Sequence, residues 1–148
     1  MITYIKGDLF STNADIIAHG CNCLGGYGSG VAYTMARNYP KAKSLYLEKY
    51  DEEGWNLGDV QMVLQRDGKY IANCATQDSF LPRGICHADY EAIRLCMEKV
   101  KRFAKNKGLS IAIPKIGAGL AGGDWTIIEG ILKGVFNDYD ITVYYLEN

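Results

Sequence analysis

Residues 19–32 of the chain read HGCNCLGGYGSGVA, and five of them are glycine. The apolar residues 16–18 come before this stretch, and a helix-compatible segment begins at Val31. The local order is therefore strand, glycine loop, helix. Glycine removes the Cβ that would hold a ligand away, so backbone N–H groups can converge on an anion, and the helix start adds a positive dipole end. The stretch predicts a phosphate-binding loop, with a flexible turn as the alternative.

A second stretch of the same kind lies at residues 111–125, which read IAIPKIGAGLAGGDW. Again an apolar strand leads into a glycine-rich loop that opens a helix. Two such loops at the same ends of neighbouring strands would form the two walls of one crevice, where a diphosphate can lie. The first stretch has the spacing of neither a Walker A loop nor GxGxxG, which disfavours a kinase or a nicotinamide-dependent oxidoreductase that would bind its nucleotide there.

The composition is that of an ordinary globular protein. The chain has 148 residues, of which 48% are hydrophobic and 22% charged, and its formal net charge is -1. We expect one domain over residues 1–148 and no general nucleic-acid binding, because there is no broad basic field. No apolar run approaches the roughly 20 residues of a membrane helix, and the first residues lack the pattern of a signal peptide. The expected location is cytoplasmic, with no membrane partner.

The cysteine pattern argues against a disulfide framework. There are five cysteines, an odd number without a CxxC pair, so we expect reduced and mostly buried thiols. A zinc site made of Cys21, Cys23 and Cys86 with His87 would have a non-standard spacing. We therefore expect no metal and no other cofactor.

Hydrophobic periodicity along the chain predicts interleaved strands and helices. Strands are expected at residues 2–6, 16–19, 59–66, 70–75, 109–114 and 141–146, and helices at 31–38, 40–50, 88–105 and 124–136. Asp67-Gly68 is a hairpin signal that makes one pair of strands antiparallel. The predicted fold class is α/β: a three-layer α/β/α sandwich around a mixed, mainly parallel sheet of about six strands.

Three motifs together resemble those of the macrodomains, a family that binds ADP-ribose. They are GDLF at residues 7–10, GSGVA at 28–32 and PKIGAGLAGGDW at 114–125, and the resemblance covers the whole chain in the right order. The stretch from His19 to Ala42 looks most like the yeast-type ADP-ribose-1″-phosphate phosphatases. The second loop and the last strand also resemble the terminal ADP-ribose protein glycohydrolase group.

The resemblance implies a layout for the ligand. Asp8 and the backbone of Leu9 would hold adenine, flanked by Tyr144 or Tyr145 with Leu146, although Asp8 alone reads as a turn residue. The two glycine loops would wrap the diphosphate, and Asn22 would face the distal ribose. The candidate ligand-binding residues are Asp8, Leu9, Asn22, Tyr27, Gly28, Ser29, Gly30, Val31, Thr76, Lys115, Ile116, Gly117, Ala118, Gly119, Leu120, Ala121, Tyr144 and Leu146.

The candidate catalytic residues are Asn22, His19 and Asp124. His19 has an ordinary pKa suited to proton transfer, but a histidine that ends an apolar strand can equally be a satisfied core residue. Asp124 can act as a base or cap the following helix, with Thr126 and Glu129 behind it in capping-box spacing. Asn22 would orient the ribose or a water molecule.

Four other side chains near the loops also bear on the expected site. Tyr27 can form a lid over the ribose or face solvent, and Lys115 can neutralise phosphate or lie on the surface. Trp125 is expected to pack beneath the second loop. Cys21 is disfavoured as a phosphocysteine nucleophile, because the arginine and loop pattern of cysteine phosphatases are missing.

The resemblance favours phosphomonoester hydrolysis over removal of ADP-ribose. The glycohydrolase group has a lysine in the loop after the fourth strand and an aspartate in the second glycine loop. Here the corresponding positions offer Gln77 with Asp78, and Ala121. We expect a metal-independent ADP-ribose-1″-phosphate phosphatase that binds ADP-ribose or its 1″-phosphate. The alternatives are a mono-ADP-ribosyl hydrolase acting on ADP-ribosylated protein or nucleic acid, and a non-catalytic ADP-ribose reader.

Overall fold

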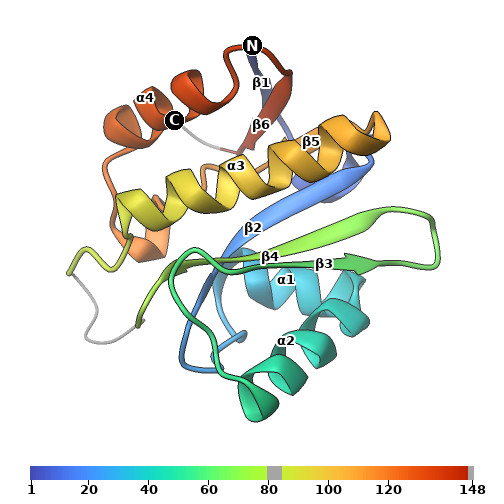
Figure 1. The fold of residues 1–148 in the computed structure, drawn as a ribbon, viewed down its shortest axis with the longest axis vertical. Coiled ribbons are helices and arrows are strands. Elements are labelled where there is room, and N and C mark those ends of the chain that lie inside the picture. The colour runs from blue at the N-terminus through green and yellow to red at the C-terminus, as the bar shows by residue number, and fades with distance from the viewer. Residues whose placement is uncertain (80–84, 147–148) are drawn as a thin grey trace.

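The structure, a computed structural model, describes residues 1–79 and 85–146, in which strands and helices alternate as expected (Figure 1). The strands are β1 (Ile2–Lys6), β2 (Ile16–Asn22), β3 (Val60–Leu64), β4 (Tyr70–Gln77), β5 (Ile111–Ile113) and β6 (Ile141–Tyr145). The α-helices are α1 (Gly30–Asn38), α2 (Pro40–Glu52), α3 (Tyr90–Lys107) and α4 (Trp125–Val135), and short 3-10 helices lie at Leu9–Ser11 and Gly119–Ala121.

The strands form one mixed sheet in the order β1-β6-β5-β2-β4-β3. All neighbouring strands are parallel except β3, which pairs with β4 through the predicted hairpin. At that hairpin the backbone N–H of Gln65 donates to the carbonyl of Lys69 at 2.8 Å. The mainly parallel sheet is therefore confirmed, and the carboxyl ends of β1, β6, β5, β2 and β4 lie along one edge.

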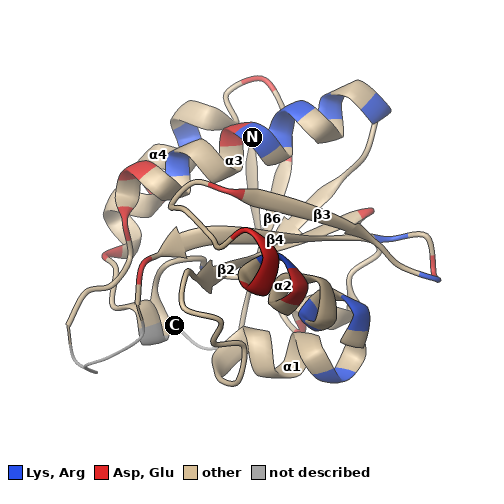
Figure 2. Ribbon diagram, turned by 60° about the horizontal axis from the view of Figure 1, so that its bottom comes forward, with Lys and Arg blue, Asp and Glu red and all other residues tan. Residues whose placement is uncertain are grey.

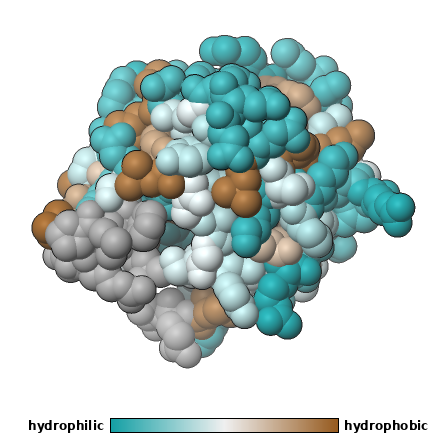
Figure 3. All heavy atoms as spheres, turned by 90° about the horizontal axis from the view of Figure 1, so that it is seen from below, coloured by the Kyte–Doolittle hydropathy of each residue, from teal (hydrophilic) through white to brown (hydrophobic). Residues whose placement is uncertain are grey.

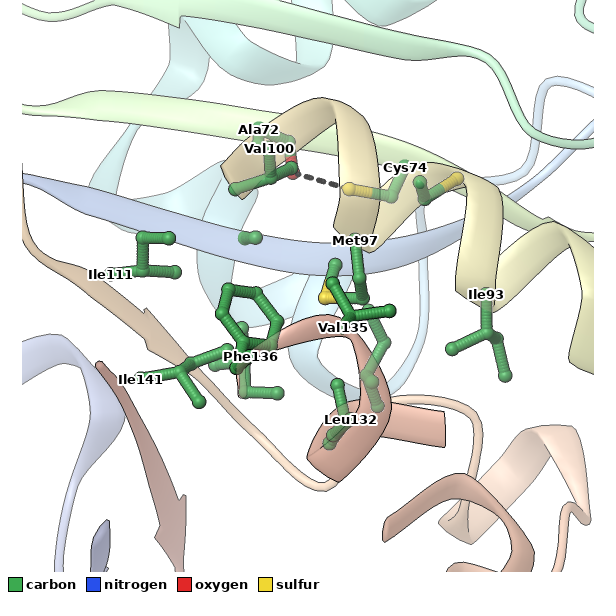
Figure 4. Packing of buried hydrophobic residues seen from close by; sticks show 14 of the residues in the cluster. Ala72, Cys74, Ile93, Met97, Val100, Ile111, Leu132, Val135, Phe136 and Ile141 are labelled. Carbon is green, nitrogen blue, oxygen red and sulfur yellow. Dashed lines mark hydrogen bonds between the residues drawn. The ribbon is translucent and has the colours of Figure 1, made fainter. Parts of the chain in front are cut away.

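Helices cover both faces of the sheet, which confirms the three-layer sandwich (Figure 1). On one face α3 and α4 pack over an aliphatic core, in which Met97, Leu132 and Phe136 are fully buried (Figure 4). Such helices need one apolar side only, and α3 has it at the spacing expected from the sequence.

The opposite face, under α1 and α2, has a more aromatic and more polar interior. Tyr46 is fully buried there, and its ring centre lies 5.0 Å from that of Trp55 and 5.0 Å from that of Tyr27. On the face seen from below, the described residues that are visible mix hydrophobic and hydrophilic side chains (Figure 3). The two helical layers therefore cover cores of different chemistry.

Several boundaries differ from the predicted ones. Strand β2 runs to Asn22 rather than ending at His19, because it is a central strand whose pairing with β4 continues as far as Asn22 opposite Gln77. Helix α3 begins at Tyr90 because the side chain of Asp89 caps it by accepting from the backbone N–H of Ala92 at 2.8 Å. The strand expected at 109–114 is shorter, and the two 3-10 helices were not predicted.

Three further findings concern membrane-spanning helices, the cysteines and metal-binding groups. No helix within the described ranges has the length and apolar character needed to cross a lipid bilayer. The five cysteines are free, and Cys21, Cys74 and Cys96 are buried. The described residues contain no group of three or more His, Cys, Asp or Glu side chains placed to hold a metal ion.

Candidate functional site

The two glycine loops lie next to each other at the carboxyl edge of the sheet. The first follows β2 and the second follows β5, and these two strands are parallel neighbours, with Ile16 opposite Ile111 and Ile17 opposite Ala112. The ends of β6 and β1 continue the edge on one side and the end of β4 on the other. The expected meeting of two loops distant in sequence is therefore confirmed.

Asn22 organises the first loop through its side-chain amide. Its Oδ1 accepts hydrogen bonds from the backbone N–H groups of Leu24 at 2.9 Å and Gly26 at 3.1 Å, and its Nδ2 donates to the carbonyl of Gly26 at 2.8 Å. The hydroxyl of Tyr46 donates to the carbonyl of Asn22 at 2.7 Å and accepts from the N–H of Gly25 at 3.1 Å. The loop is thus closed by side chains, and Asn22 is 8% exposed.

A buried polar group supports this loop from beneath. Nε2 of His19 lies 2.7 Å from Oδ1 of Asn73 and 3.0 Å from the hydroxyl of Tyr27, which also donates to Asn73 at 2.9 Å. Asn73 in turn donates to the carbonyl of Ala42 and to Gln61, both at 3.0 Å. His19 and Tyr27 are therefore tied to the α1–α2 side of the core.

This burial corrects two expectations. His19 is 0% exposed, and desolvation lowers its pKa to about 4, so it stays neutral at pH 7 and lies out of reach of solvent. Tyr27 is 3% exposed, so it is neither a lid over a ligand nor a solvent-facing loop residue. We assign both side chains to the support of the loop rather than to chemistry on a ligand.

The second loop is closed mainly by its own backbone. The N–H of Gly123 donates to the carbonyl of Gly117 at 2.8 Å, and the N–H of Gly122 donates to that of Gly119 at 3.0 Å. Gly117 has φ +79°, and a Cβ there would lie 2.7 Å from Cδ1 of Ile93. A Cβ on Gly123 would lie 2.4 Å from the carbonyl oxygen of Gly117, so both positions require glycine.

The first loop leads into a helix whose start is not capped by a side chain. Ser29 is the N-cap residue of α1, but its hydroxyl makes no capping hydrogen bond, and the first turn of α1 has no acidic residue. By contrast, Asp89 caps α3 and Asp124 caps α4. The first backbone N–H groups of α1, like those of α2, therefore lack the side-chain acceptor that α3 and α4 have.

The predicted adenine end is gathered at the same edge of the sheet. Because Lys6 pairs with Tyr145, Asp8 and Leu146 follow two neighbouring strands, and the N–H of Gly7 donates to the carbonyl of Tyr145 at 2.8 Å. The exposed Asp8 accepts from the N–H of Phe10 at 3.0 Å, which is its turn role. Leu9 is buried, Leu146 is 70% exposed, and the hydroxyl of Tyr144 donates to Thr12.

Comparison with known proteins gives the family. The macro domain family matches residues 18–132, which include most of β2, both glycine loops and most of α4. The chain belongs to the macro domain family.

The chain is similar to relatives with two different named activities and to a solved macrodomain structure. The chain is similar to the ADP-ribose 1''-phosphate phosphatase of Saccharomyces cerevisiae, with 30% identity over 98% of this chain and 98% of that protein. It is 29% identical to the DNA ADP-ribosyl glycohydrolase of Mycobacterium tuberculosis over 97% of this chain but 42% of that protein. The macrodomain of Mycobacterium tuberculosis DarG has a TM-score of 0.85 and 28% identity, with 97% of each chain covered.

In this macro domain Asp124 lies where the second loop enters α4. Its Oδ1 accepts from the N–H of Thr126 at 2.9 Å, which is the capping role. The expected capping box of Thr126 with Glu129 is not formed, because the cap is Asp124 and Glu129 instead accepts from the hydroxyl of Tyr4. Asp124 is exposed, so a ligand at the second loop could reach it.

Lys115 lies on aromatic rings. Its Nζ is 5.8 Å from the ring centre of Trp125 and 5.5 Å from that of Tyr145. Tyr4 meets both rings edge-on, which builds an aromatic cluster between β1, β6 and the start of α4. Stacking on these rings is a sufficient reason for this lysine's position.

Several other predicted ligand residues have buried side chains. Thr76, Ile116 and Ala121 are 1%, 2% and 5% exposed. Oγ1 of Thr76 has no hydrogen-bond partner among the described residues, and it fills the space where a Cβ on Gly20 would lie. The side chains of Ile116 and Ala121 are buried, so in the expected diphosphate cradle these residues would contribute backbone groups.

The loop after β4 reaches both glycine loops. The carbonyl of Asp78 accepts from the N–H of Cys23 at 3.2 Å, and the carbonyl of Ala121 accepts from the N–H groups of His87 at 2.7 Å and Ala88 at 3.2 Å. From the sequence, residues 76–87 are expected to form a loop that could cover a site; of these, residues 80–84 lie outside the described residues. Sequence reasoning considered His87 only as a metal ligand. The sequence signal that could have predicted its contact with Ala121 is its position just before a helix that packs behind the second loop.

The thiols of the first loop are poor nucleophiles. Burial raises the pKa of Cys21 well above its ordinary range, and burial together with Asp78 and Asp59 raises the pKa of Cys23 to about 11. Both thiols stay protonated at neutral pH. A phosphocysteine route is therefore not supported at either position.

Proposed function

We propose that this macro domain binds ADP-ribose across its two glycine loops and removes the phosphate from ADP-ribose-1″-phosphate. The observation that carries the proposal is the uncapped start of α1 beside the backbone-closed second loop. Helix N–H groups without a side-chain acceptor are a favourable site for phosphate oxygens. The full-length similarity to the fungal phosphatase supports the finer activity.

The ligand would lie along the carboxyl edge of the sheet. Adenine would lie between Asp8 and Leu146, with the exposed carboxylate of Asp8 accepting from its amino group. The diphosphate would receive N–H groups from residues 28–31 and 117–121. Asn22, at the end of β2, would be nearest to the distal ribose and would hold the loop that contacts it.

The reaction would be attack of a water molecule on the terminal phosphorus. The water oxygen forms the new P–O bond, the bond from phosphorus to the 1″ oxygen breaks, and that oxygen takes a proton to become the ribose hydroxyl as inorganic phosphate is released. Backbone N–H groups can stabilise the phosphoryl oxygens without a metal ion. Asp124 would accept the water proton, Asn22 would orient the ribose, and His19 would act indirectly by holding Tyr27 and the loop.

A phosphate-release assay tests this proposal. Asp124→Asn keeps a good helix cap but removes the base, so phosphate release should fall at least a hundredfold while the unfolding free energy changes by less than about 0.5 kcal/mol. The matched control is Asp51→Asn at the end of α2, which should keep the full rate. EDTA should leave the wild-type rate unchanged.

Three other outcomes would redirect the proposal. Equal rates for wild type and Asp124→Asn would remove Asp124 from the chemistry. Tight ADP-ribose binding without phosphate release would indicate a reader. Release of ADP-ribose from a modified protein or nucleic acid, without phosphatase activity, would indicate the glycohydrolase activity that the Mycobacterium tuberculosis relative is named for.

A further inference from the structure

A pocket of about 310 Å³ lies between α1 and α2, beside the first glycine loop, from which Tyr27 and Gly28 contribute to its lining. Its walls include Gly28 of the loop, Tyr33 and Arg37 of α1, and Pro40 and Lys43 of α2. Its volume is at the lower end of the range for small-ligand sites. A single nucleotide or a group of similar size would fill it.

The pocket is basic and has no acidic counterpart nearby in the chain. Between Asp15 and Glu48 the sequence contains no acidic residue. Among the described residues, neither Arg37 nor Lys43 has a carboxylate within ion-pair distance. On the other side of the sheet, by contrast, Arg94 of α3 pairs with two glutamates.

The charges of α2 are placed against its dipole. Lys41 and Lys43 are in its first turn, and Asp51 and Glu52 are in its last turn together with one cation, Lys49. Figure 2 shows the acidic residues at one end of α2 and basic residues at the other, beside α1. Cations at a helix N-terminus are unfavourable for the helix itself. The arrangement instead strengthens the positive potential over the pocket, which suits an anionic ligand.

An aromatic ring completes the pocket. Tyr33 is 51% exposed, and the guanidinium carbon of Arg37 lies 5.8 Å from its ring centre. An exposed aromatic face beside unpaired cations is the combination by which proteins hold a nucleobase and its phosphate. Phosphate alone would leave the tyrosine and the apolar wall of Pro40 unused.

We propose that this pocket is a second nucleotide site, which takes one nucleoside monophosphate unit. The base stacks on Tyr33, and the phosphate lies between Arg37 and Lys43. The unit is either a free nucleotide or one residue of a single-stranded nucleic acid. The site is local, so it agrees with the absence of a broad basic field in this chain.

Titration of thymidine monophosphate tests the site, because this ligand has neither adenine nor a diphosphate. Backbone amide signals of Ala36 and Ser44 should shift with a saturable profile in NMR spectra. Arg37→Gln/Lys43→Gln should weaken binding at least tenfold, and Tyr33→Ala should weaken it at least threefold. The control Arg102→Gln/Lys107→Gln removes one arginine and one lysine from α3 and should leave affinity within twofold.

Titration of an eight-residue oligothymidylate distinguishes a nucleic-acid strand from a free nucleotide as the ligand of this pocket. Binding more than tenfold tighter than the monophosphate, with a steep salt dependence, supports a nucleic-acid strand. Equal affinities support a free nucleotide.

The nucleotide site would be overturned if inorganic phosphate bound with the same affinity as thymidine monophosphate, or if binding of the monophosphate were not saturable. It would also be overturned if the control variant lost as much affinity as Arg37→Gln/Lys43→Gln. ADP-ribose titrated into the same variants should bind within twofold of wild type, whether or not phosphate release is observed. That arm keeps the two proposals separate.

Discussion

The two glycine loops follow neighbouring strands at the carboxyl edge of the sheet, but they are built in different ways. The first is held by side chains of Asn22, Tyr27 and Tyr46, which come from β2, the loop itself and α2. The second is held by backbone hydrogen bonds between its own residues, such as Gly123 to Gly117. The first loop should therefore be sensitive to loss of a side chain, and the second to gain of one.

The largest effect is expected for Gly123→Ala. The new Cβ would lie 2.4 Å from the backbone oxygen of Gly117, which cannot move without opening the loop. We expect a loss of about 3 kcal/mol in unfolding free energy and at least a hundredfold in ADP-ribose affinity, by urea denaturation and calorimetry. Gly130→Ala is the control: it faces open space on α4 and should stabilise by up to about 1 kcal/mol. Wild-type affinity in Gly123→Ala would show that the second loop is adaptable.

Acid should act on the first loop and spare the second. The pKa of His19 is lowered from 6.5 to about 4, so the unfolded chain binds the proton more readily than the folded protein. The contribution of His19 to the unfolding free energy, about 3 kcal/mol, is present in full above pH 6.5 and is lost as the pH falls toward 4.

Denaturation of wild type and His19→Gln between pH 4 and 7 measures this difference. The wild-type curve should be steeper by about one proton. Tyr27→Phe should keep the steeper curve, because burial is the main cause of the pKa shift and the histidine remains. Parallel curves for wild type and His19→Gln would contradict the burial of a neutral imidazole.

The same contrast explains what could be predicted from the sequence. The position of the second loop between a strand and a helix could be predicted, because the glycines and the strand that determine it lie within fifteen residues of one another. The support of the first loop was not, because Asn73, the partner of His19 and Tyr27, lies on β4 and becomes their neighbour only through strand pairing. Sequence patterns give local periodicity, but they do not show which polar side chain finds a distant partner.

Asp124 and Lys115 illustrate the limits at the level of single residues. The position of Asp124 before an apolar helix predicted a helix cap, and the structure has this cap. Thr126 and Glu129 have capping-box spacing but do not form the box, because the N-cap residue is Asp124, two residues before Thr126. Lys115 was read as a phosphate ligand or a surface residue. The rings of Trp125 and Tyr145, which come from separate elements, determine its position instead.

A smaller effect is expected for Asn22→Ala. It removes an acceptor from the N–H groups of Leu24 and Gly26 in a partly buried loop, so we expect a loss of about 2 kcal/mol. ADP-ribose affinity should fall about tenfold, because the loop loses its fixed shape. Asn38→Ala, at the exposed end of α1, is the control and should change stability by less than about 0.5 kcal/mol. A fully retained affinity would mean that the ligand itself orders the loop.

The smallest effect is expected for Tyr46→Phe, and it tests the comparison directly. The variant keeps the ring against Trp55 but loses the hydroxyl bonds to Asn22 and Gly25, at about 1 kcal/mol. Combined with Asn22→Ala, it should be non-additive by at least about 0.5 kcal/mol, because both act on one hydrogen-bonded group. Combined with Asp124→Ala, which removes the cap at the second loop, it should be additive. Coupling of equal size in both pairs would mean that the two loops are one cooperative unit rather than two independently supported walls.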